Sequence, residues 1–164
     1  MTEKITDSNQ IRKKAMDLLA RREHSRLELS RKLKQRYLDV HLINSVIDLL
    51  IEENLQSDER FTEAYLRSRI EKGKGPNIIF SELLQKGIDE SLASSILGTI
   101  SEEEWCKLAS SVMNKKLGYN KELDYHKQLK LMKFLTYRGF TRDQIEKAKY
   151  LLSDNNSTDI NEDK

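Results

Sequence analysis

Apolar residues recur at spacings of three and four along most of the chain. No segment alternates apolar and polar residues convincingly with a period of two. The first spacing is typical of amphipathic α-helices, whereas half-buried strands need the second. Capping residues and glycines then divide the pattern into segments of helical length. The sequence therefore predicts an all-α protein with nine helices.

The predicted helices follow from these start and stop signals. They begin near Ser8 or Asn9, at a Ser25–Glu28 capping box, near Asp39, at Ser57, Pro76, Asp89, a Ser101–Glu104 capping box, near Glu122, and at Thr141 with Gln144. The corresponding ends lie near Glu23, Arg36, Asn54, Gly73, Gly87, Ile100, Gly118, Gly139 and Leu152.

Three parts of the chain share one register, at offsets of 50 and 52 residues. Aligned leucines are followed four residues later by a turn position and then by an apolar residue: Leu33, Tyr37 and Leu38; Leu83, Gly87 and Ile88; Leu135, Gly139 and Phe140. Tyrosine disfavours the left-handed backbone that glycine allows, so the turn at Tyr37 is expected to differ.

Each repeat alone has too few apolar side chains to fold stably by itself. Stacked repeats can bury their remaining apolar faces against one another. We therefore predict three tandem three-helix, helix-turn-helix-like repeats in an elongated, curved array. The predicted divisions are a flexible N-terminus (1–8), repeats at 9–55, 56–100 and 101–152, and a disordered acidic tail (153–164).

Composition narrows the class of protein. Charged residues make up 34% of the 164 residues and hydrophobic residues 37%, which is typical of a thin core under a heavily solvated surface. Cys106 is the only cysteine, so an intrachain disulfide is excluded. No apolar run approaches the roughly 20 residues of a membrane span, and MTEKITDSNQ lacks the apolar core of a signal peptide. We expect a cytoplasmic protein.

The net charge of +2 conceals blocks of alternating sign, such as +6 for residues 1–36 and −6 for residues 37–63. Clustered Lys and Arg side chains can neutralise phosphates and release counterions without reading sequence. The candidate binding residues are Arg67, Arg69, Lys72 and Lys74 in the centre, Arg26, Arg31, Lys32 and Lys34 before them, and Lys130, Lys133 and Arg138 near the end. The plain alternative for each is a solvated helix face.

The break GKGP contains Lys74 of the central cluster, and backbone N–H groups at the start of the Pro76 helix could add an anion site. Alternatively, Gly73 and Pro76 act only as stop and start signals. The break lacks the spacing and the Lys-Ser/Thr ending of a phosphate-binding loop.

Catalytic and metal sites find no support in the sequence. The carboxylates of Asp58, Glu59 and Glu63 match the preference for acidic residues at a helix start, and no nearby His or Cys completes a metal set. The three histidines are scattered. We therefore expect neither enzymatic activity nor a cofactor.

The run SDERFTEAYLRSRIEKGKGP, followed by ELLQKGI, resembles the central segment of the RecX family of bacterial regulatory proteins. AMDLLARREHSRLELSRKLKQR and VIDLLIEENL resemble its first unit, and KLMKFLTYRGFTRDQIEKAKYLL its last, so the resemblance covers about residues 10–152. It implies tandem three-helix units and a non-catalytic protein that binds the RecA recombinase along its filament on single-stranded DNA. Such a protein limits filament growth and suppresses strand exchange, ATP hydrolysis and co-protease activity, and so modulates recombination, DNA repair and the SOS response.

The expected partners are thus the RecA filament and DNA without sequence preference, single-stranded with double-stranded as an open alternative. No membrane is expected among them, and we expect a monomer. Two other functions stay open: a helix-turn-helix DNA-binding regulator without a RecA partner, and a helical scaffold that binds only protein.

Overall fold

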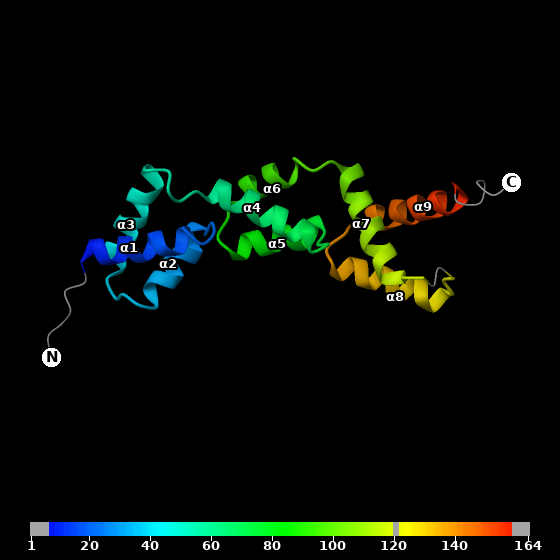
Figure 1. The fold of residues 1–164 in the computed structure, drawn as a ribbon, viewed down its shortest axis with the longest axis horizontal. Helices are drawn as coiled ribbons and strands as arrows, with labels where there is room; N and C mark the ends of the chain where they lie inside the picture. Colours follow the sequence, from blue (N-terminus) through cyan, green and yellow to red (C-terminus); the bar gives the residue numbers. More distant parts are fainter. Residues whose placement is uncertain (1–6, 120–121, 159–164) are drawn as a thin grey trace. The chain divides into compact units, whose positions relative to one another are not determined.

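The computed structural model describes residues 7–119 and 122–158, and over these residues it contains nine α-helices and no β-strand (Figure 1). The prediction of an all-α protein with nine helices is confirmed. The helices are α1 (Ser8–Leu19), α2 (Arg26–Lys34), α3 (Val40–Glu52), α4 (Asp58–Glu71), α5 (Pro76–Gln85), α6 (Glu90–Leu97), α7 (Glu102–Leu117), α8 (Tyr125–Tyr137) and α9 (Arg142–Thr158).

The start of α7 follows the predicted capping chemistry, whereas the start of α8 and the end of α1 differ from the prediction. The Ser101–Glu104 box at α7 is complete, because each side chain accepts the other residue's backbone N–H, at 3.2 and 2.8 Å. Helix α8 begins three residues after the predicted Glu122, because the Asp124 carboxylate accepts the N–H of Lys127 at 2.8 Å. Helix α1 ends at Leu19, before the predicted Glu23.

Helix α9 continues six residues beyond the predicted end at Leu152. The Ser153 hydroxyl donates to the carbonyl of Lys149 at 3.1 Å, one turn back, so this polar residue is accommodated in the helix. Of the tail that the sequence assigns to disorder, residues 153–158 are therefore helical. Residues 159–164, and residues 1–6 of the predicted flexible N-terminus, lie outside the described residues.

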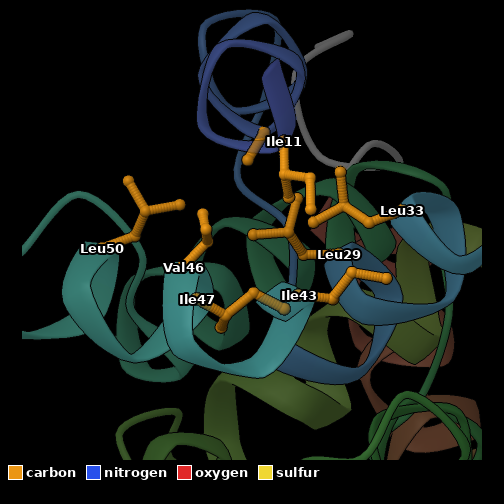
Figure 2. Close-up of a cluster of buried hydrophobic side chains, with 8 residues drawn as sticks. Ile11, Leu29, Leu33, Ile43, Val46, Ile47 and Leu50 are labelled. Carbon is orange, nitrogen blue, oxygen red and sulfur yellow. The ribbon is translucent and has the colours of Figure 1, made fainter. Parts of the chain in front are cut away.

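The first three helices surround one apolar cluster (Figure 2). Helix α1 contributes Ile11 and Ala15, α2 contributes two leucines, and α3 contributes one face at the expected spacing. The members are Ile11, Ala15, Leu29, Leu33, Ile43, Val46, Ile47 and Leu50, of which Val46 is 4% exposed and the others 0%.

By its contacts the chain divides into two compact units, Met1–Tyr65 with Leu83–Ala93 (unit 1) and Leu66–Glu82 with Ser94–Lys164 (unit 2). The divisions fall inside α4, α5 and α6. The middle three helices therefore contribute one part to the packing of the first repeat and another part to the packing of the third.

In unit 2, the turn before α5 packs against the turn before α9. The Gly75 N–H donates to the carbonyl of Arg138 at 2.7 Å, and the Asn77 N–H donates to that of Gly139 at 2.9 Å. A Cβ added to Gly75 would overlap the backbone of Gly139. The GKGP segment thus joins two repeats as well as reversing the chain.

In unit 1, the turn before α2 and the turn before α6 meet in the same way. The Ser25 hydroxyl donates to the carbonyl of Lys86 at 2.7 Å, and a Cβ on Gly87 would approach the Cβ of Leu27 to 2.7 Å. Ser25 precedes Gly75 by 50 residues, and Lys86 precedes Arg138 by 52, which are the offsets of the sequence repeat. One turn-on-turn contact therefore occurs twice.

Glu28 strengthens this contact, and for that reason the predicted capping box at Ser25 is only half formed. The Ser25 hydroxyl accepts the Glu28 N–H at 3.1 Å, but the Glu28 carboxylate instead pairs with Lys86 at 2.7 Å and Arg22 at 3.0 Å. Burial raises the pKa of Glu28, yet hydrogen bonds from Lys86 and Arg22 outweigh it and leave the pKa below its ordinary value. The stabilisation is therefore present above the ordinary carboxyl pKa and is lost as the pH falls through the depressed one.

The backbone of the equivalent turn in the first repeat differs, as expected from the tyrosine at position 37. Gly87 and Gly139 have φ values of 79° and 96°, whereas Tyr37 does not adopt a positive φ. The following residue is buried in the second and third repeats, where Ile88 is 3% exposed and Phe140 2%. Leu38, at the same register position, is 94% exposed. Without the left-handed residue, the chain turns this side chain outward.

Gly75→Ala is expected to lower the free energy of unfolding by about 3 kcal/mol, because a backbone cannot yield to the added methyl group as a flexible side chain can. Gly98→Ala is the matched control, since neither glycine has a positive φ and the new Cβ at 98 meets only carbonyls of its own chain segment, at 3.2 Å or more. Its effect should stay within about 1 kcal/mol. Urea unfolding followed by circular dichroism measures both, and equal effects would contradict the turn-on-turn packing.

Candidate nucleic-acid and partner interface

Unit 2 has a basic groove of about 420 Å³ between the end of α4, the second half of α7 and the end of α8. We call it the α7–α8 groove. Its charged lining consists of four cationic side chains and one carboxylate: Lys72, Lys115, Lys116, Arg138 and Glu71. Lys72, Lys115 and Lys116 are exposed, so their ammonium groups face solvent.

Close backbone packing sets the position of this groove. Gly73 ends α4 with a φ of 71°, and a Cβ there would approach Cγ2 of Val112 on α7 to 2.8 Å. Lys115 and Lys116 follow Val112 by three and four residues, so they lie on the same side of α7. The Arg138 guanidinium donates to the carbonyl of Lys72 at 2.7 Å and ties the end of α8 to the end of α4.

An aromatic ring lies between two of the cations. The Lys116 Nζ is 4.8 Å from the centre of the Phe134 ring, and the Arg138 Cζ is 5.0 Å from it. A ring face attracts cations through its quadrupole and keeps them close together despite their mutual repulsion. The groove therefore concentrates positive charge more than separate surface lysines would.

A second depression of about 240 Å³ continues the basic surface along α8. Its cations are Lys116, Lys127 and Lys130, and its apolar lining is Leu117, Leu123 and Leu131. Because Lys116 lines both depressions, the two form one cationic track across α7 and α8. Its chemistry is that of a site for a polyanion rather than for a single small ligand.

The central cluster predicted from the sequence separates in the structure. Arg67 is exposed, Lys72 lines the α7–α8 groove, and Lys74 is half-buried. Arg69 pairs with Glu82 on α5 at 3.1 Å, which gives its guanidinium a structural contact. The expectation of an anion site at the start of the Pro76 helix is wrong, because the Gly75 and Asn77 N–H groups donate to Arg138 and Gly139.

The cluster on α2 also divides. The Arg26 side chain pairs with Asp48 at 2.7 Å, and its backbone N–H donates to the Asp58 carboxylate at 2.7 Å. Arg31, Lys32 and Lys34 are exposed and form no ion pair within the part of the chain that the structure describes.

In unit 2, Lys130 joins the cationic track, Lys133 is exposed on α8, and Arg138 lies between α4 and α8.

Two further features were not predicted from the sequence. Lys115 and Lys116 were not among the candidate residues, although the adjacent lysines and their three- and four-residue spacing from Val112 would have placed them beside an α7 core face. The exposure of the tyrosines also differs along the chain: Tyr37 and Tyr65 are half-buried, whereas Tyr119, Tyr125 and Tyr137 are 107, 72 and 81% exposed. Aromatic rings available for stacking thus lie on the same two helices, or directly after them, as the cationic track.

The described residues offer little support for a metal site, a reactive cysteine or a membrane-spanning helix. No group of three or more His, Cys, Asp or Glu side chains there could hold a metal ion. Cys106 is buried, and burial raises the pKa of its thiol, so the nucleophilic thiolate is disfavoured. Within the same residues, no helix is both long and apolar enough to cross a membrane.

Three family models match the chain in order: the first, second and third three-helix domains of RecX, at residues 12–50, 57–97 and 102–148. The regulatory protein RecX of Halorhodospira halophila is 38% identical over 148 residues, which cover 90% of this chain and 91% of that protein. RecX of Pseudomonas entomophila is 40% identical over 135 residues, or 82% of this chain and 86% of the relative. The crystal structure of RecX from Lactobacillus salivarius superposes with a TM-score of 0.78 at 25% identity, covering 89% of this chain and 96% of that one.

Arg138→Ala is expected to lower the free energy of unfolding by about 1–3 kcal/mol, because it removes a charge-assisted hydrogen bond to Lys72 and the contact with Phe134. Lys133→Ala, on the exposed face of the same helix, should change it by about 0.5 kcal/mol or less. Chemical unfolding of the two variants makes the comparison. If both are neutral, Arg138 has no structural role.

Proposed function

Because this chain belongs to the RecX family of regulatory proteins, we propose that it is a non-catalytic regulator of RecA. It binds the RecA filament and DNA, and it inhibits the ATPase, strand-exchange and co-protease activities of RecA. Recombination, DNA repair and the SOS response are modulated as a result.

The observation that carries the DNA-binding part of this proposal is the α7–α8 groove with its continuation along α8. Ammonium groups bind phosphates mainly by releasing condensed counterions, which gives affinity without sequence preference. A track that includes Lys72, Lys115 and Lys116 and extends to Lys127 and Lys130 can contact several successive phosphates. Of the residues proposed from the sequence, Lys72, Lys130 and Arg138 belong to this surface, while Arg67, Lys74, Lys133 and the α2 cations are proposed as secondary contacts.

Exposed aromatic rings favour single-stranded DNA as the ligand of this surface. Tyr119 and Tyr125 flank the connection between α7 and α8, and Tyr137 lies at the other end of α8. Unpaired bases stack on such rings at about 1–3 kcal/mol per base, whereas bases within a duplex already stack on one another.

A helix-turn-helix regulator that reads duplex sequence is the second candidate, since each repeat has three helices. That function needs a helix with base-contacting side chains that can enter the major groove. The third helices of the first two repeats, α3 and α6, contain no Lys or Arg at all. This composition disfavours sequence reading by either helix. A scaffold that binds only protein would show no salt-dependent binding to DNA.

The proposed function is tested by adding the full chain to RecA on single-stranded DNA and following ATP hydrolysis and filament length. We expect both to fall at stoichiometric amounts. A control without RecA measures binding to the same DNA as a function of salt. Unchanged hydrolysis and filament length would refute the proposal, and a sharp preference for one duplex sequence would favour the helix-turn-helix alternative.

The groove is tested by Lys115→Ala with Lys116→Ala, which should weaken binding to single-stranded DNA and flatten its dependence on salt. Two lost phosphate contacts correspond to a decrease of about 1.4 in the logarithmic salt slope. The matched control, Lys107→Ala with Lys147→Ala, removes the same charge from exposed positions outside the groove and should retain the slope. Identical slopes for the two double variants would remove the groove from the interface.

A further inference from the structure

Leu38 is exposed, although the residues at its register position in the other two repeats are buried. A single exposed leucine is ordinary on a protein surface. However, the two equivalent residues, Ile88 and Phe140, are 3 and 2% exposed and follow turns that dock onto a neighbouring repeat. The turn at Leu38 belongs to the first repeat, and Leu38 itself is 94% exposed. No described residue of the chain therefore covers its apolar side chain.

The surroundings of this turn are apolar at the tip and basic at the side. Val40 is 44% exposed, two residues after Leu38. Arg36 and Tyr37 line a groove of about 320 Å³ together with Lys13, Lys14, Gln10 and Asp17. Three cations and one carboxylate leave this groove with a positive charge. A complementary surface would be acidic and would offer an apolar pocket.

The turn is held in a fixed conformation for such a contact. Tyr37 packs against the apolar cluster of the first repeat, and its hydroxyl donates to the carbonyl of Gln10 at 3.3 Å. Its backbone N–H also donates to the carbonyl of Leu33 at 2.9 Å. A side chain presented from an ordered turn loses less conformational entropy on binding than one on a mobile segment.

We propose that Leu38, Val40, Arg36, Lys13 and Lys14 form a protein-docking face whose partner is an acidic protein surface with an apolar pocket. The inference rests on the proposed function, under which that surface belongs to RecA in the filament. Nucleic acid is a poorer match, because a phosphate backbone offers nothing to an exposed leucine. The residues of this face are thus assigned to protein contact, and those of the cationic track along α7 and α8 to DNA contact.

A second copy of this chain does not fit the same face through the contact that joins its repeats. In that contact a glycine approaches the neighbouring turn so closely that even a Cβ would lie 2.7 Å from Leu27, or 2.6 Å from Ile78. The first repeat has Tyr37 at this position. The larger side chain prevents the equivalent approach, so this turn cannot join a second copy through the same contact.

The test compares Leu38→Asp with Leu49→Asp, a matched control on α3 of the same repeat, where the leucine is 51% exposed. Both variants are expected to unfold at the wild-type temperature, since both sites face solvent. Binding is measured to RecA filaments on single-stranded DNA and to the same DNA without RecA. Leu38→Asp should weaken filament binding by at least about tenfold, as removal of a central apolar contact does. It should leave binding to bare DNA unchanged, and Leu49→Asp should change neither.

Every other outcome overturns the inference, and the pattern of binding shows which part of it fails. Equal filament binding by Leu38→Asp and the wild type would show that the face contacts no protein, and the proposed function would stand. Equal loss on the filament and on bare DNA would show that the face binds nucleic acid. If the wild type itself does not bind the filament, the proposed function fails together with its named partner. A second variant, Arg36→Glu, should reproduce the selective loss of filament binding.

Discussion

The hydrogen bond from Gly75 to the carbonyl of Arg138, at 2.7 Å, and its counterpart from Ser25 to the carbonyl of Lys86 hold successive repeats together. Each three-helix repeat has only a small core, so most of its stability must come from such neighbours. Each contact depends on glycine, because a Cβ on Gly75 would lie 2.4 Å from the backbone of Gly139 and a Cβ on Gly87 would lie 2.7 Å from the side chain of Leu27. It also creates the α7–α8 groove, since the same turns bring Lys72 and Arg138 together.

Much of this architecture follows from local signals in the sequence. Helix starts at Ser101 and Thr141 were predictable because reciprocal capping depends on residues only three positions apart. The different turn at Tyr37 was predictable for a similar reason, since backbone conformation there is decided by the residue itself. The end of α9 was not, because the polar residues after Leu152 are compatible with either helix or coil.

The binding surface was less predictable, because the partner of a charged side chain is chosen by the tertiary fold. Arg69 and Arg26 look like free cations in the sequence, yet they pair with Glu82 and Asp48. The sequence can place Lys115 and Lys116 beside the core face of α7, but their place in the groove depends on the packing of α7 beside α8. The N–H groups at Gly75 and Asn77 show the same limit, since their acceptors lie more than 60 residues away.

Amide hydrogen exchange of the full chain, free and bound to RecA filaments on single-stranded DNA, tests the central claim most directly. The claim is that separate surfaces of one repeat array contact DNA and RecA. Bound protein should show slower exchange around residues 36–40 and along the parts of α7 and α8 that line the groove, whereas DNA alone should slow exchange along the groove and leave residues 36–40 unchanged. Protection confined to other surfaces, or none at all, would contradict it.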